Sequence, residues 1–502
     1  MTDKAAPQRA PFWRTLLVAW AILAAIGAMW SIATPIGGAP DEPAHLIKAA
    51  SVVRGELVGT SVVGGQRVSV PEYIAFSEVE SCFAFHPTTT PKCAPADSAK
   101  PETRLVPAVT SAGLYNPLYY VLVGWPSLIF TNSGGIYAMR IVSDVLVALF
   151  LAISFAFVAL WSRRTIPLIG ILTAFTPMVF FLGGSVNPNS LEIAATLAAF
   201  TGVLTVVRLP AREFLASRML LVFLSASVAA NMRGLSLLWV AIAVVAPLIL
   251  ATRNSLAELL KTRAVRLALM GTALACAFAA VWLLASNSLG IGSSGSTQLG
   301  GAPGVGTSHL LGFAWNLGST FYYGQQIVGV FGWLDTVAPA AVYFVWAMLV
   351  GTFVLFGFAV LRRRALKFVA VLVAALLLLP PILQGIYITS GGIIWQGRYI
   401  LPVFVCAVVG IAAVLSEAVN IPAAILRRLA LFVTLVWAAA QVLAFATTLK
   451  RYAVGTKAGW PAILHPVWAP PGGVDAVLVV SVLVFLAAGI VAWRYGRREL
   501  PA

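Results

Sequence analysis

Charged residues are scarce in this sequence, and their scarcity excludes a water-soluble globular protein. Only 10% of the 502 residues are charged, whereas 60% are hydrophobic. A soluble chain of this size needs more charge to cover its surface. Apolar runs of roughly 17–25 residues, the length that crosses a bilayer core, recur along the whole chain. The sequence therefore predicts an all-α polytopic membrane protein.

The sequence also has no contiguous basic stripe and no nucleotide-binding motif. Its formal net charge is +16, but the basic residues form short clusters between apolar runs, as topology signals do, so nucleic acid is excluded as a partner. Neither a GxxxxGK[ST] motif nor a Rossmann fingerprint is present. The glycine-rich segment 291–306 has the composition of a flexible outer loop. Any reaction must therefore use a substrate that arrives already activated, from the membrane or from outside.

The basic clusters separate the apolar runs into membrane spans. The first run follows Lys4, Arg9 and Arg14 and ends without a small-residue cleavage pattern, which predicts an uncleaved signal anchor. In all we predict about twelve transmembrane helices, at 15–33, 136–161, 166–184, 190–208, 217–231, 234–252, 266–287, 337–361, 367–388, 399–417, 427–447 and 474–494.

Most basic residues fall on one side of these spans, and the positive-inside rule assigns that side to the cytoplasm. We therefore predict a multi-pass protein of a bacterial plasma membrane with both termini cytoplasmic. Its organisation is a cytoplasmic tail 1–14, the first helix 15–33, an extracytoplasmic loop 34–135, a bundle 136–494 with outer loops 289–336 and 448–473, and a tail 495–502. The apolar segment 115–130 is short and rich in aromatics, so we predict an interfacial or re-entrant segment within the first loop.

Cysteine usage agrees with this topology. Cys82 and Cys93 both fall in the first outer loop, and an oxidising exterior favours a disulfide between them. A metal site needs four ligands, and only His86 lies between the two cysteines. Cys276 and Cys406 lie within spans and read as packing residues.

Two carboxylates come directly after the first span, in the segment GGAPDEPAHLIKAASVVRGEL (37–57). A purely structural interpretation is available, because Asp41 suits a helix N-cap and Glu42 complements the helix dipole. Their position favours a functional interpretation. An acidic pair and His45, tethered within a turn of the bilayer surface, are costly unless they are used or paired.

These residues resemble the first-loop acidic motif of GT-C glycosyltransferases, membrane enzymes that use polyprenyl-phosphate sugars. YNPLYY (115–120), GSVNPNSLEIA (184–194) and NMRGLSLL (231–238) are similar to further GT-C segments, with Asn116 where a proline is common. PDEPAH, GSVNPN, FGWLDT (331–336) and WQGRYILP (395–402) together resemble one family of bacterial, largely actinobacterial, integral membrane proteins of unknown function. The resemblance implies a GT-C-like fold, with short amphipathic helices in the large first loop.

The resemblance implies an inverting transfer of a sugar from a polyprenyl-phosphate donor to an envelope glycan or lipid acceptor. Such a reaction needs a base for the acceptor hydroxyl and cations for the phosphate. We assign Asp41 as the base, Glu42 to orienting the acceptor or holding a cation, and Arg398, Arg233 and Lys48 to the phosphate. The residues expected to line the substrates or the lipid groove are His45, Tyr115, Asn116, Tyr119, Tyr120, Asn187, Asn189, Glu192, Trp333, Trp395, Gln396 and Tyr399.

One departure from the family pattern concerns a metal. Asn187 and Asn189 stand where many relatives carry an acid after Pro188, so no metal ligand is assigned and a divalent cation, Mg²⁺ or Mn²⁺, is left open. Other interpretations stay open as well. Arg398 would also snorkel to the interface, the aromatics would also form an interfacial belt, and Arg140 and Asp144 are spaced for an intrahelical ion pair. The alternative functions are a lipid-linked-sugar flippase and an envelope-assembly scaffold.

Overall fold

The computed structural model describes residues 12–95, 102–161, 164–209, 214–288 and 303–496. Within these residues, nine helices are long and apolar enough to cross a membrane. They are α1 (Phe12–Ala33), α5 (Gly134–Val158), α8 (Pro188–Arg208), α12 (Arg263–Ala285), α15 (Ala340–Val360), α16 (Arg363–Gly391), α17 (Leu401–Ala418), α18 (Ala423–Val454) and α19 (Val474–Gly496). The predicted helical, polytopic architecture is confirmed. Most of both predicted tails and of the segment 291–306 lies outside the described residues.

The predicted count of twelve spans is not confirmed. A tenth span is formed if the pair α6 (Thr165–Ala174) and α7 (Pro177–Gly183), bent by 59°, crosses as one. The two other predicted spans, 217–231 and 234–252, coincide with α9 (Leu215–Ala230) and with α10 (Ser236–Val245) followed by η5 (Ala246–Leu250). These apolar helices are shorter than the roughly 20 residues that a straight span requires.

The bend between α6 and α7 leaves backbone groups that neighbouring side chains satisfy. The Phe175 carbonyl accepts hydrogen bonds from the Trp437 indole at 3.2 Å and the Gln441 amide at 2.8 Å. The Thr176 hydroxyl caps α7 and donates to the Ile327 carbonyl at 2.8 Å. A broken helix is tolerated at membrane depth because protein groups replace the missing backbone partners.

Two helices form the centre of the bundle. In α8 and in the span that contains α17, 89% and 94% of the most apolar window is buried. Around them, α1 packs along α5, α18 packs along α19, and α12 is peripheral. A central helix contacts other helices on all of its faces. Its sequence is therefore apolar all round, with no polar face.

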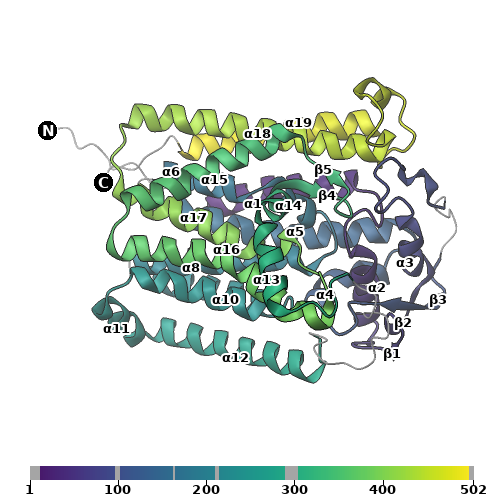
Figure 1. Cartoon of the computed structure of the whole chain (residues 1–502), viewed down its shortest axis with the longest axis horizontal. Helices are drawn as coiled ribbons and strands as arrows, with labels where there is room; N and C mark the ends of the chain where they lie inside the picture. Colours follow the sequence, from purple (N-terminus) through teal and green to yellow (C-terminus); the bar gives the residue numbers. More distant parts are fainter. Residues whose placement is uncertain (1–11, 96–101, 162–163, 210–213, 289–302, 497–502) are drawn as a thin grey trace.

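The first outer loop forms a small α/β cap at one end of the bundle, with α11 (Arg253–Lys261) at the opposite end (Figure 1). Strands β1 (Thr60–Val62), β2 (Gly65–Pro71) and β3 (Leu105–Thr110) make an antiparallel sheet in that order, with Val68 opposite Ala108. Helix α2 (Glu42–Val52) packs against β2 and β3. We predicted only helices here and missed the sheet, although β2 buries alternate residues, Gln66, Val68 and Val70.

The rest of the outer side consists of short elements. In the first loop these are α3 (Glu72–Ala75), η1 (Phe76–Ser81), η2 (Pro91–Cys93), α4 (Leu118–Gly124) and η3 (Trp125–Leu128). In the later loops they are α13 (His309–Gly318), α14 (Thr320–Gly329), β4 (Val330–Phe331), β5 (Thr336–Val337), η7 (Gly397–Ile400) and η8 (Trp460–Leu464). The apolar residues 118–128 form a helical segment shorter than a straight membrane span.

A buried ion pair joins the first loop to the bundle. The Arg140 guanidinium donates to both Glu42 carboxylate oxygens, at 2.7 and 2.5 Å, and both side chains are fully buried. It also donates to three carbonyls at the end of α1, those of Ser31, Thr34 and Pro35. All five guanidinium N–H groups are therefore used.

This arrangement corrects the predicted pair of Arg140 with Asp144 on the same helix. The Asp144 carboxylate packs against Gly27 of α1, and its Oδ2 atom has no hydrogen-bond partner among the described residues. Glu42 is a stronger partner for Arg140 because it offers both oxygens in the fork geometry that a guanidinium matches.

Candidate active site

Asp41 stands where the first loop begins α2, and its carboxylate faces outward from the helix. Its φ of 65° is left-handed, a conformation that aspartate tolerates better than most residues. The side chain makes no capping hydrogen bond, so the helix-capping interpretation of this residue is wrong. The carboxylate is instead 47% exposed and pairs with the Arg398 guanidinium.

Two buried groups fix the turn that carries Asp41. The Arg398 side chain is only 4% exposed, so it does not snorkel to the interface, and it also donates to the Pro40 carbonyl at 3.4 Å. The Asn187 amide donates to the same carbonyl at 3.2 Å, while its oxygen caps α8. The turn is thus held from η7 and from the N-cap of α8, which are more than a hundred residues away in the sequence.

A second arginine lies close to the first. The Tyr399 ring contacts both guanidiniums, with Arg398 Cζ at 5.3 Å and Arg233 Cζ at 4.6 Å from its centroid. Arg233 comes from the turn between α9 and α10, and its side chain is 19% exposed. Two fixed cations that contact the same aromatic ring, one of them partly exposed, form a site that favours an anion.

Glu192 of α8 supports Arg233 from within the protein. Its buried carboxylate lies 3.9 Å from the guanidinium and accepts hydrogen bonds from Ser236, at 2.5 Å, and Asn189, at 3.0 Å. Asn189 keeps an amide oxygen without a partner among the described residues. Glu192 therefore pairs with the arginine, and Asn189 fixes Glu192; whether these two residues also line the substrate, as the sequence predicted, stays a prediction.

The electrostatics keep Asp41 charged and His45 neutral. Burial raises the pKa of the Asp41 carboxyl, but the Arg398 guanidinium, with help from His45 and Arg233, more than offsets it, so this pKa lies below its ordinary 3.8. Burial lowers the pKa of His45 to about 3, and the two arginines lower it further against the opposing effect of Asp41. His45 is thus an uncharged hydrogen-bonding group, with Nδ1 2.9 Å from the Tyr120 hydroxyl.

Several predicted site residues have structural roles instead. Glu42 is closed off by Arg140. Lys48 is buried and donates to the carbonyls of Leu57 and Gly113. Burial lowers its pKa to about 8. The Tyr119 hydroxyl lies 2.8 Å from that of Ser143, and the Trp333 indole donates to the Gly37 carbonyl at 2.8 Å. We therefore remove Glu42 and Lys48 from the substrate-contacting set.

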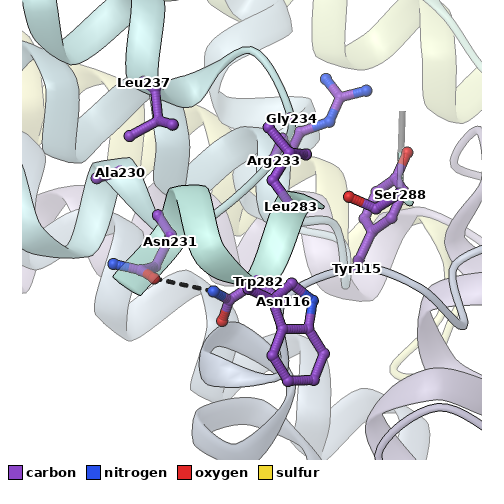
Figure 2. A pocket seen from close by; sticks show the side chains of 11 residues that line it. Tyr115, Asn116, Ala230, Asn231, Arg233, Gly234, Leu237, Trp282, Leu283 and Ser288 are labelled. Atoms are coloured by element: carbon purple, nitrogen blue, oxygen red, sulfur yellow. Dashed lines mark hydrogen bonds between the residues drawn. The ribbon is translucent and has the colours of Figure 1, made fainter. Parts of the chain in front are cut away.

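A narrow cleft opens beside Arg233 (Figure 2). Tyr115 and Asn116 form one side, and the Asn116 amide donates to Asn231 at 2.9 Å. Trp282 of α12 closes the cleft and donates from its indole to the Leu114 carbonyl. The Arg233 guanidinium points away from the two asparagines. The sequence analysis missed Asn231 and Trp282, although Asn231 stands two residues before the assigned Arg233.

A separate apolar groove of about 440 Å³ lies close to Arg398 in the sequence. It runs between α14, α15, α16 and the start of α17, and Ile400 at its end is two residues from Arg398. Gln326 of α14 accepts the Gly397 N–H at 2.6 Å and so joins the groove wall to the site. Trp395 packs near Tyr399, with ring centroids 5.8 Å apart, and the Trp395 indole and the Gln396 amide oxygen have no partner among the described residues.

No group of three or more histidine, cysteine, aspartate or glutamate side chains comes close enough to hold a metal within the ranges that the structure describes. The predicted disulfide between Cys82 and Cys93 is confirmed. The loop that it closes contacts the last turn of α18 through Arg451, which also pairs with Asp335 in the turn between β4 and β5.

Comparisons with known proteins identify the family. No curated protein matches the chain. Among solved structures, ArnT from Cupriavidus metallidurans, crystallised in the apo state, is similar with a TM-score of 0.43 and 13% identity, over 96% of this chain and 77% of ArnT. That similarity is too low to transfer the role of any residue. The family model described as a predicted membrane protein, DUF2142, matches residues 24–407, the part that holds every site residue described above, and the chain therefore belongs to the DUF2142 family.

Proposed function

We propose that this protein transfers a sugar from a polyprenyl-phosphate donor to an envelope acceptor on the outer face of the plasma membrane. One observation carries the proposal: a half-exposed carboxylate, Asp41, is paired with one of two arginines that contact the same aromatic ring. The order of the GT-C-like motifs along the chain agrees with it. A base and an anion site side by side are what this reaction requires.

The proposed step is a direct displacement at the anomeric carbon. The acceptor oxygen forms a bond to that carbon, and the bond from the carbon to the phosphate oxygen breaks, leaving its electron pair on the phosphate. The acceptor proton goes to the Asp41 carboxylate. The lowered pKa of Asp41 keeps the carboxylate ready to accept, and the single displacement inverts the configuration of the sugar.

The two arginines suit the departing phosphate. Negative charge grows on its oxygen as the sugar leaves, and a guanidinium fixed beforehand stabilises that charge without reorganising. Arg398 cannot rotate freely because Asp41 and Pro40 hold it, and Glu192 holds Arg233. The apolar groove that ends at Ile400 is large enough for several isoprene units of the donor chain.

The proposal is tested with purified protein in nanodiscs and a panel of radiolabelled polyprenyl-phosphate sugars. We expect release or transfer of at least one sugar, with inverted stereochemistry. If every donor stays intact while fluorescent donor lipid crosses reconstituted membranes only when the protein is present, the enzyme proposal is wrong and a flippase replaces it.

Replacing Arg398 by lysine should weaken donor use even though the positive charge remains. A lysine ammonium has no planar fork and cannot serve Asp41 and a phosphate together. We expect kcat/KM for the donor to fall by about 10²-fold, equivalent to the loss of one preorganised charge-assisted contact. Arg104→Lys is the matched control, because Arg104 is 74% exposed and pairs only with Glu72. Equal donor use by Arg398→Lys and the wild type would remove Arg398 from the phosphate site.

The pH dependence should reveal the lowered pKa of Asp41. A general base acts only in its deprotonated form, and the lowered pKa keeps the Asp41 carboxyl deprotonated to lower pH. We therefore expect kcat/KM to stay level from pH 8 to 5 and to decline only below pH 3.8. Because His45, with a pKa of about 3, does not titrate in this window, no decline is expected near pH 6.5. In Arg398→Gln the decline should move to higher pH, since the guanidinium that lowers the pKa is gone. A wild-type decline centred near 6.5 would identify a histidine as the base.

A further inference from the structure

The loop closed by the Cys82–Cys93 disulfide packs against the C-terminal end of α18. The buried Arg451 guanidinium donates to three carbonyls of this loop, those of Phe83, His86 and Thr89, at 2.9 to 3.2 Å. Thr456, just past α18, donates from its backbone to the Pro87 carbonyl at 3.0 Å. One side chain thus fixes the conformation of the whole disulfide loop.

The same arginine fixes a second segment, the hairpin between β4 and β5. Arg451 pairs with Asp335 at 3.0 Å, and both side chains are almost completely buried. Within that hairpin the Trp333 ring packs against Phe85 of the disulfide loop, with centroids 5.4 Å apart. The disulfide loop, the hairpin and the end of α18 therefore form one connected unit, which we call the brace (residues 82–93, 330–337 and 451–456).

The brace holds the turn that precedes Asp41. Trp333 donates from its indole to the Gly37 carbonyl at 2.8 Å, and Tyr452 donates from its hydroxyl to the Gly38 carbonyl at 3.0 Å. Ser81, next to the disulfide, also donates to the Gly37 carbonyl, at 3.3 Å. Gly37 has a φ of +68°, and a Cβ there would lie 2.3 Å from the Ser81 hydroxyl, so the close approach requires glycine.

We propose that the brace positions Asp41, and that the Cys82–Cys93 disulfide is the part of it that makes the positioning dependent on oxidation. Trp333 and Tyr452 are then positioning residues that act on Asp41 through the carbonyls of Gly37 and Gly38. The proposal rests on the proposed function only in taking Asp41 as the general base. Both cysteines are exposed, so a dithiol reductant can reach them, donating two electrons and two protons to give two thiols while it becomes a disulfide itself.

The purely structural alternative is that the brace only stabilises the outer cap. The positioning proposal and the structural alternative predict different results when single hydrogen bonds to the turn are removed and the cap is left intact. Only the positioning proposal predicts that the turn before Asp41 becomes less ordered. Trp333→Phe keeps a ring against Phe85 but removes the donor to Gly37, and Tyr452→Phe removes only the donor to Gly38. Tyr73→Phe is the matched control, because its hydroxyl donates to Phe130, away from the turn.

Hydrogen–deuterium exchange of the full-length protein in nanodiscs tests the proposal without an activity assay. The backbone N–H groups of Gly38, Glu42 and His45 are hydrogen-bonded within the turn and the first turn of α2. We expect the peptide spanning 36–46 to exchange about tenfold faster in Trp333→Phe/Tyr452→Phe, in Cys82→Ser/Cys93→Ser and after reduction, with α5 and α8 unchanged. Tyr73→Phe should leave this peptide as in the wild type.

Kinetics with an active donor separate positioning from stability. A displaced base lowers kcat, and a misplacement of about 1 Å lowers it on the order of 10²-fold. KM for the donor should change by less than about threefold, because both arginines stay in place. If exchange rises only in the peptide 82–93 and the peptide 36–46 is unaffected, the positioning proposal is overturned. If exchange rises as expected but no donor is ever turned over, the proposed function fails and the brace stands.

Discussion

Replacing Asp41 by asparagine should abolish nearly all sugar transfer while leaving the protein folded. Asparagine has the same shape but cannot take a proton from the acceptor, and removal of a general base typically costs 10²–10⁴-fold in rate. We expect kcat for the preferred donor to fall by about 10³-fold, the middle of that range. The measurement is single-turnover transfer with purified protein at pH 7, together with donor binding measured separately.

Donor binding distinguishes a lost base from a lost site. In Asp41→Asn the Arg398 guanidinium loses its counter-charge but keeps its contact with Pro40, so the phosphate should bind at least as tightly as in the wild type. Asp475→Asn, an exposed acid at the start of α19, is the control and should be fully active. Wild-type turnover in Asp41→Asn would show that another group is the base, whereas loss of both binding and turnover would make Asp41 a structural residue.

Removing Arg140 should destabilise the protein more than any other single change in the outer half of the bundle. Arg140→Met leaves the buried Glu42 carboxylate without its counter-charge, with only the Val186 N–H still donating to it, and removes the donor to three carbonyls at and just past the end of α1. Breaking one partner of a buried pair typically costs about 3–5 kcal/mol, and the unsatisfied carbonyls act in the same direction. Glu42→Gln should cost less than Arg140→Met, because the amide oxygen still accepts one hydrogen bond.

Asp144→Asn is the matched control for this prediction. Asp144 lies one turn from Arg140 on α5, and if the two formed a pair, Asp144→Asn would remove the counter-charge of a buried guanidinium and would also destabilise the protein strongly. The structure places no such bond, so Asp144→Asn should shift the midpoint of SDS-induced unfolding by much less than Arg140→Met. Equal shifts for the two variants would contradict the Arg140–Glu42 pairing.

The positions of the membrane helices were predictable because they depend on local composition. A run of about 20 apolar residues has no stable place except the bilayer core, so all nine long helices coincide with predicted spans. The predicted count of spans is not confirmed where length is marginal. The segments at 217–231 and 234–252 are apolar enough, but α9 has only 16 residues and α10 has 10 before it continues as η5. Helices α6 and α7 bend where Trp437 and Gln441 satisfy an open carbonyl.

The disulfide was predictable for a related reason: both cysteines fall in one exposed loop, which the sequence predicted to lie on an oxidising side, where cysteines pair readily. The sheet in the first loop was missed although the alternation in β2 is visible in the sequence, because its strands are short and their partner β3 lies beyond a long insertion. Short strands are defined by their pairing more than by their own residues.

The sequence by itself determined that this is a multi-span membrane protein, and it located the carboxylates and arginines that are candidates for chemistry. Only the tertiary structure decided which of them pair. Arg140 bonds Glu42 across 98 residues and Arg398 bonds Asp41 across 357, and no helical spacing encodes contacts at such separations. The two adjacent acids thereby have opposite environments: the fold encloses Glu42 on all sides in a satisfied ion pair, and leaves Asp41 half open beside two arginines. Burial and partner geometry, which depend on every packed helix at once, decided which of them is left free to act.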